Sequence, residues 1–112
     1  MPLYMSRFGY QPETWAALVK HPENRKDAVA RMLEDAGCRL HDIWYGFGEQ
    51  DGFALIEAPN NATAAGLAIA ITSSGAFRTF ETTVVMTQAE LLEALEKAAE
   101  VAYTAPAAAV HA

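Results

Sequence analysis

The sequence has only one cysteine, Cys38, among its 112 residues. A single thiol cannot form an intramolecular disulfide, and no second cysteine stands at the spacing of a metal site. This composition excludes a disulfide-stapled secreted scaffold and favours a protein of the reducing cytoplasm. The first residues also lack a basic segment followed by an apolar run, so no secretion signal is expected.

Basic residues are also scarce. Lys and Arg total 8 against 14 for Asp and Glu, which gives a formal net charge of −6. An acidic chain is poorly suited to phosphate contacts, so no nucleic-acid partner is expected. The longest apolar stretch, residues 62–71, is rich in alanine and interrupted by Gly66. Because it is much shorter than a membrane span, no membrane partner is expected either.

Patterns that hold metals or nucleotides are missing. The three histidines, His21, His41 and His111, do not stand at the spacing of metal ligands. The segment Gly46-Phe47-Gly48 leads into an expected hairpin, whereas a phosphate loop needs a helix start at that point. No serine stands in a context that suggests activation as a nucleophile. The sequence therefore predicts no metal and no other cofactor.

What the sequence does contain is the pattern of one globular domain, with 52% hydrophobic and 20% charged residues. Strands are expected at residues 2–10, 38–47, 52–58 and 77–86, and helices at residues 12–21, 22–36, 61–73 and 88–103. Pro22 breaks the first helical region in two. The order is that of a ferredoxin-like βαββαβ fold of the α+β class with an extra C-terminal helix. Residues 1–103 are expected to form this domain and residues 104–112 a flexible tail.

Both faces of the expected sheet carry apolar side chains. In the strand 77–86, one alternating set holds Phe77 and Val85 and the other holds Phe80 and Val84. Neither set is hydrophilic enough for a solvated face. Two helices cover only one face, so the other is expected to pair with a second copy, in a homodimer or a higher oligomer. The alternative is a monomer whose terminal helix folds back over that face.

One stretch of the chain resembles a known family. Residues 44–59, with the sequence Trp-Tyr-Gly-Phe-Gly-Glu-Gln-Asp-Gly-Phe-Ala-Leu-Ile-Glu-Ala-Pro, precede an alanine-rich helix, Ser74-Gly75 and the segment 78–82, Arg-Thr-Phe-Glu-Thr. This arrangement resembles the GYD-domain family over about residues 3–87. The resemblance implies a dimeric α+β barrel.

The segment that names the family departs from its pattern at one position. Gly48 and Asp51 match the Gly and Asp of the family's Gly-Tyr-Asp segment, but the tyrosine is Gln50 here. The resemblance implies no settled activity, because the wider superfamily includes cofactor-independent monooxygenases, isomerases, cyclases and haem enzymes.

Three residues are candidate catalytic groups. His21 precedes the Pro22 kink, and Arg25 follows it within a turn. The imidazole is a candidate base and the guanidinium a candidate holder of a carboxylate or enolate, at the mouth of a cavity between helix and sheet. His41, on the second strand, is another candidate base. The alternative is that His21 ends a helix, Arg25 pairs with a neighbouring carboxylate, and His41 has an ordinary hydrogen bond.

Aromatic residues gather around the expected hairpin and the first strand and helix. The candidate ligand-binding residues are Tyr4, Trp15, Trp44, Phe47 and Phe53. Such a cluster can line an apolar pocket for a flat ligand, or it can be core.

Three charged residues stand in otherwise apolar strands, namely Glu57, Arg78 and Glu81. Because charge in such strands needs a partner, they are expected to form intersubunit salt bridges or to contact a ligand.

Two hypotheses remain open. One is a dimeric protein that binds a small apolar or aromatic acid or enol, as a cofactor-independent enzyme that transfers a proton or oxygenates its substrate. The other is a non-catalytic assembly or regulatory module with a filled core, which has no cavity for a ligand.

Overall fold

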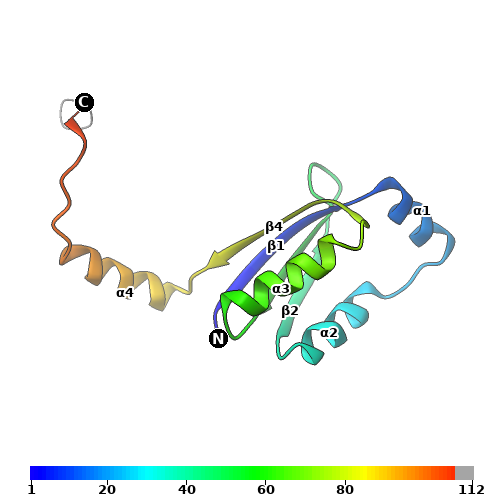
Figure 1. The fold of residues 1–112 in the computed structure, drawn as a ribbon, viewed down its shortest axis with the longest axis horizontal. Helices are drawn as coiled ribbons and strands as arrows, with labels where there is room; N and C mark the ends of the chain where they lie inside the picture. Colours follow the sequence, from blue (N-terminus) through cyan, green and yellow to red (C-terminus); the bar gives the residue numbers. More distant parts are fainter. Residues whose placement is uncertain (108–112) are drawn as a thin grey trace.

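The computed structural model describes residues 1–107 and is built on a four-stranded antiparallel sheet with the strand order β2-β3-β1-β4. Its elements are β1 (Leu3–Tyr10), α1 (Pro12–Lys20), α2 (Arg25–Asp35), β2 (Arg39–Tyr45), β3 (Gly52–Glu57), α3 (Asn61–Thr72), β4 (Phe77–Val85) and α4 (Gln88–Ala99) (Figure 1). This order and topology confirm the expected ferredoxin-like α+β fold.

The helical region before β2 divides near Pro22, as expected, but the second helix begins later than predicted. His21 has φ −133° and ψ 79°, outside the helical region, because the residue before a proline is pushed toward extended conformations. Asn24 then caps α2, its side chain accepting a hydrogen bond from the Asp27 amide at 3.2 Å. The start of the helix is therefore at Arg25 and not at Pro22.

Two other elements were predicted to extend too far along the chain. β2 ends at Tyr45, so Phe47 lies beyond the strand, and α4 ends at Ala99 and not near Tyr103. The tail predicted for residues 104–112 lies partly outside the residues that the structure describes, which stop at 107. No described helix combines the length and the apolar character needed to cross a membrane.

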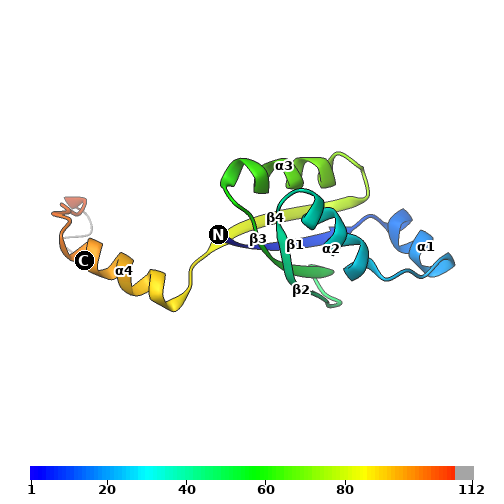
Figure 2. The same ribbon diagram turned by 90° about the horizontal axis from the view of Figure 1, so that it is seen from below.

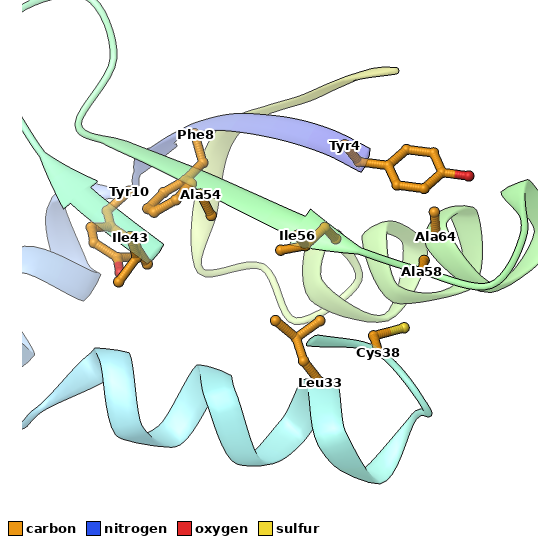
Figure 3. Close-up of a cluster of buried hydrophobic side chains, with 10 residues drawn as sticks. All are labelled: Tyr4, Phe8, Tyr10, Leu33, Cys38, Ile43, Ala54, Ile56, Ala58 and Ala64. Atoms are coloured by element: carbon orange, nitrogen blue, oxygen red, sulfur yellow. The ribbon is translucent and has the colours of Figure 1, made fainter. Parts of the chain in front are cut away.

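The core lies on the face of the sheet that α2 and α3 cover (Figure 3). Alternate residues of β1 point to that face, and the ladder aligns Tyr4 with Ile56 and Phe8 with Gly52. Phe8 is 5% exposed and stands at the centre of an aromatic cluster. Its ring centroid lies 5.5 Å from that of Tyr10, 5.6 Å from that of Phe77, 6.1 Å from that of Tyr45 and 6.3 Å from that of Phe80.

The opposite face of the sheet is apolar too, and α2 and α3 do not cover it. Its side chains include Leu3, Met5 and Arg7 of β1, Trp44 of β2, Phe53 and Leu55 of β3, and Val85 of β4. Below, this surface is called the open face. Two sheet faces with apolar side chains were expected from the sequence, and the strand register confirms them.

The terminal helix does not cover the open face. α4 projects away from the rest of the chain, beyond the end of β4, and lengthens the molecule to 59 Å in its longest direction (Figures 1 and 2). None of its residues is buried. The monomer in which this helix folds back over the sheet is therefore not the arrangement found.

Candidate functional site

A cavity of about 330 Å³ lies between α2, α3 and the sheet. Most of its wall is apolar, with Met32 and Leu33 from α2, Leu67 and Ile71 from α3, and Phe8 from β1 among the lining residues. A volume of this size is at the lower end of the range of small-molecule sites.

The hollow follows from small side chains on facing elements. Ala64 and Ala68 of α3 line it from one side, and Ser6 and Ala54 of the two central strands line it from the other. Because these residues add little volume, the helix and the sheet do not fill the space between them. Within the described chain, the interior is therefore not fully packed, in contrast to the filled core of the alternative hypothesis.

Two hydroxyl groups interrupt the apolar wall. Ser6 Oγ of β1 and Thr82 Oγ1 of β4 lie 2.9 Å apart, and either can be the donor. They come together because the ladder pairs these two residues directly. Each hydroxyl can also bond to a ligand, since a hydroxyl has one donor and two acceptor positions.

Arg25 contributes the cavity's cationic group. Its Nη1 lies 2.9 Å from Glu23 Oε1, so one of its five N–H donors is already used. Burial acts to lower the pKa of Arg25, but the contacts with Glu23 and Tyr10 outweigh it, and the pKa is raised above its usual value. The guanidinium therefore carries its positive charge near neutral pH.

Two tyrosines stand beside Arg25. The hydroxyl oxygens of Tyr10, which lines the cavity, and Tyr45 lie 3.3 Å apart. Burial and the contact with Tyr10 raise the pKa of Tyr45 far above its usual range. Tyr45 therefore stays protonated near neutral pH and can act only as a neutral hydrogen-bonding group.

Of the three candidate catalytic residues, only Arg25 lines the cavity. His21 is exposed at the end of α1, and its amide bonds to the Ala17 carbonyl at 2.9 Å. His41 lies on the open face, where its Nε2 is 2.8 Å from Glu57 Oε1. The structure therefore does not bring the two histidines together with Arg25, and the roles predicted for them stay predictions.

The five candidate ligand-binding aromatics lie elsewhere, because side chains of a strand alternate between faces. Tyr4 is in the core and donates a hydrogen bond to Asn61 Oδ1 at 2.7 Å. Trp44 and Phe53 pair across the open face, and Phe47 is fully exposed beyond the end of β2. Trp15 of α1 contacts the hairpin turn. None of the five lines the cavity, and their contacts with a ligand stay predictions.

The cavity residues that sequence reasoning missed include three with hydroxyl groups, Ser6, Tyr10 and Thr82. A signal for Ser6 exists, since it alternates with the core residues Tyr4 and Phe8 in β1. Thr82 has a similar signal, since it alternates with Phe80 and Val84 in β4, but its contact with Ser6 joins residues 76 positions apart and is not visible in the sequence.

The charged strand residues on the open face are ion-paired. Arg7 Nη2 lies 3.6 Å from Glu81 Oε2. The hydrogen bond from His41 lowers the pKa of Glu57 below its usual value. The sequence predicted intersubunit salt bridges or ligand contacts for these charges, whereas the partners found among the described residues are within the same chain.

Glu57 makes the stability of the fold depend on pH. Because its pKa is lowered in the folded protein, it stabilises the fold above the unfolded pKa of about 4.5, and this contribution is lost as the pH falls through the folded pKa. Glu57→Gln is therefore expected to lower the thermal midpoint at pH 7 and to have no effect at a pH well below 4.5. Thermal melts of Glu34→Gln, an exposed carboxylate of α2, are the control. An equal decrease for Glu57→Gln at both pH values contradicts the prediction.

The hairpin turn between β2 and β3 is attached to the rest of the fold by Asp51, which is 9% exposed. Its Oδ2 accepts hydrogen bonds from the Tyr10 amide at 2.9 Å and from Trp15 Nε1 at 3.2 Å, and Arg78 Nη2 lies 3.5 Å from it. Arg78 also donates to the Glu49 carbonyl at 2.8 Å. One carboxylate oxygen thus joins β1, α1 and β4 to the turn.

Two glycines make this arrangement possible. The Arg78 guanidinium crosses β1 where Gly9 has no side chain, and the Phe8 ring covers Gly52 of the neighbouring strand. A Cβ at either glycine would collide with these groups. Aromatic cover over a strand glycine is a known way to stabilise a sheet at that point.

Comparison with known families identifies one that matches most of the chain. The family described as the GYD domain matches residues 4–95. A search of the curated proteins finds no match.

Solved structures match at the level of the fold. The 5-chloro-2-hydroxyhydroquinone dehydrochlorinase TftG from Burkholderia phenoliruptrix AC1100, in complex with 2,5-dihydroxybenzoquinone, superposes with a TM-score of 0.55 and 11% sequence identity, covering 79% of this chain and 97% of that one. MtbAldR superposes with a TM-score of 0.53 and 10% identity, covering 78% of this chain. The match spans only 54% of the length of MtbAldR.

Proposed function

The chain belongs to the GYD-domain family, and from this premise we propose that it is a homodimeric α+β barrel that binds a small apolar or aromatic acid or enol. The ligand occupies the cavity between α2, α3 and the sheet. The observation that supports this most directly is an apolar cavity of about 330 Å³ with a single cation, Arg25, in its wall.

Arg25 suits an oxyanion on an otherwise apolar ligand. Its guanidinium is planar and carries donors in a fixed fork, which matches a carboxylate or an enolate. Glu23 and Tyr10 contact the guanidinium, and its remaining N–H groups can donate to a ligand in the cavity. The Ser6 and Thr82 hydroxyls offer a second polar contact for a ring substituent.

A structural neighbour supports this class of ligand. The ligand bound to the Burkholderia dehydrochlorinase is 2,5-dihydroxybenzoquinone, a flat ring with oxygen substituents. We propose a related shape and polarity for the ligand of this chain. We assign no proton transfer to His21 or His41, because neither lines the cavity.

The binding assignment is tested with Arg25 and its neighbour His21. We expect 2,5-dihydroxybenzoquinone or benzoate, titrated by calorimetry, to bind the wild type. Loss of a charge-assisted hydrogen bond in Arg25→Ala should weaken the binding by roughly 10- to 100-fold. His21→Ala is the control and should bind as the wild type does. Equal affinity in Arg25→Ala and the wild type would contradict the role given to Arg25.

A second test fills the cavity from α3. Ala68→Leu places a larger side chain in the hollow and is expected to abolish binding of the same probes while raising stability by about 1 kcal/mol. Ala65→Leu, on an exposed position of the same helix, is the matched control. Unchanged binding in Ala68→Leu would place the ligand outside this cavity. The two variants are compared by titration and by thermal unfolding.

The homodimer is the second part of the proposal and is supported by the open face. Trp44 is 47% exposed there, next to Phe53 and Leu55 of β3. A second copy over this face would remove these side chains from water. Analytical ultracentrifugation tests the homodimer, and a monomer at concentrations of tens of micromolar contradicts it.

The free, buried Cys38 suits a reducing compartment, and we propose that the protein is cytoplasmic.

A further inference from the structure

The terminal helix α4 is fully formed but does not pack against another element within residues 1–107. Thr87 and Glu90 form a reciprocal capping box, with the Glu90 amide donating to Thr87 Oγ1 at 3.2 Å and the Thr87 amide donating to Glu90 Oε1 at 3.1 Å. None of its 12 residues is buried. An isolated helix of this length is marginal in water, so its stability requires a surface to pack against.

One side of α4 is apolar and the other is acidic. Leu91, Leu92 and Leu95 are 39%, 54% and 57% exposed and fall on one side at helical spacing. Glu90, Glu93 and Lys97 stand on the other side. An apolar stripe of this kind is typical of a helix that packs on another body.

The position of α4 connects it to the open face. Only Met86 and Thr87 separate it from β4, whose last residue, Val85, points to that face. Met86, between them, is 59% exposed. α4 therefore begins two residues from the edge of the open face, on which the proposed second copy lies, and extends past the end of the sheet (Figure 2).

The area that a stable dimer needs also favours the participation of α4. A four-stranded sheet with about seven residues per strand presents roughly 450 Å² per copy, or about 900 Å² for two copies. Specific interfaces bury about 1,200 to 2,000 Å². A 12-residue helix is about 18 Å long and 10 Å wide, so two docked helices with the surfaces under them add on the order of 700 Å². The sheets alone fall short of a standard interface, and the sheets with both helices reach it.

We propose that α4 is an arm that docks, through Leu91, Leu92 and Leu95, on a second copy of this chain, with each copy holding the arm of the other. This inference rests on the proposed homodimer. The partner's body, and not the partner's α4, is the docking surface. Residues 88–100 carry four Glu against one Lys, so two such helices side by side repel each other.

The first experiment locates the arm by nuclear magnetic resonance. Lys97→Cys on the polar side of α4 carries a spin label, and the buried Cys38 is left in place. Spin-labelled chains without ¹⁵N are mixed in denaturant with ¹⁵N-enriched chains that carry no spin label, and the mixture is refolded. We expect broadened amide signals in the ¹⁵N chains, which identify the docking surface. Unchanged amide signals in the ¹⁵N chains overturn the inference.

The second experiment measures the contribution of the arm to dimer affinity. Leu91→Ala combined with Leu95→Ala is expected to raise the dimer dissociation constant at least tenfold, as measured by sedimentation. The control, Glu93→Gln on the opposite side, should stay within twofold of the wild type. An unchanged dissociation constant in the leucine variant overturns the arm but leaves the proposed dimer standing. A wild-type chain that is monomeric overturns both.

Discussion

Replacing Gly52 by alanine is expected to lower the midpoint of thermal unfolding by roughly 15 °C, because it forces about 3 kcal/mol of strain into the core. The Phe8 ring occupies the space that a Cβ at this position needs. Phe8 is 5% exposed and contacts the Tyr10 and Phe77 rings, so a shift of its ring disturbs the aromatic cluster. The melt is followed by circular dichroism.

Gly48→Ala is the matched control for Gly52→Ala. Gly48 lies in the same turn region, but an added Cβ there has no neighbour within 4 Å. Its thermal midpoint should stay close to that of the wild type. A double-mutant cycle with Phe8→Leu identifies the cause, since Gly52→Ala should cost much less once the ring is gone. Strictly additive effects contradict the collision with Phe8.

The order of the elements could be predicted because its signals are local. Pro12 and Pro22 mark helix ends, and Gly52 and Pro59 bound the third strand. The Thr87–Glu90 capping box was visible as a spacing and is present in the structure. Exact boundaries such as the start of α2 depend on which residue caps, and Asn24 was not considered for this role.

The site was harder to predict because it depends on side-chain direction and on volume. The register of β2 against β3 shifts between Leu40 and Asp42, so counting along the strand does not tell which face a residue takes. Trp44 and Phe53 therefore pair on the open face, although clustered aromatic side chains are also typical of a ligand pocket. The cavity itself arises where α3 and the sheet both place small residues, and this coincidence is invisible without the fold.

The family segment has a structural role here that its sequence did not reveal. In the sequence, Asp51 is simply a turn residue. In the structure it satisfies the amide of Tyr10, at the point where β1 shifts its register against β4. Gln50, which stands at the tyrosine position of the family, accepts a hydrogen bond from Thr79 Oγ1 at 3.0 Å and so also attaches the turn to β4.

Asp51→Ala is expected to lower the free energy of unfolding by about 3 kcal/mol. The substitution leaves the buried Tyr10 amide without its acceptor and removes the partner of Trp15 Nε1. It also removes the carboxylate of the ion pair with Arg78. Chemical denaturation measures the loss, and Trp15 fluorescence should change in the folded state because its indole loses the hydrogen bond.

Asp51→Asn keeps a hydrogen-bond acceptor in the side chain and removes its negative charge. All three contacts converge on the single oxygen Oδ2, so an amide oxygen in that position still accepts from Tyr10 and Trp15. Only the charge opposite Arg78 is lost, and Arg78 is partly exposed, so the expected cost is about 1 kcal/mol. If Asn is as destabilising as Ala, the negative charge and not the acceptor holds the turn. In that case Arg78→Met should be at least as destabilising as Asp51→Ala, whereas the hydrogen-bond account expects Arg78→Met to exceed Asp51→Asn only by the lost bond to the Glu49 carbonyl.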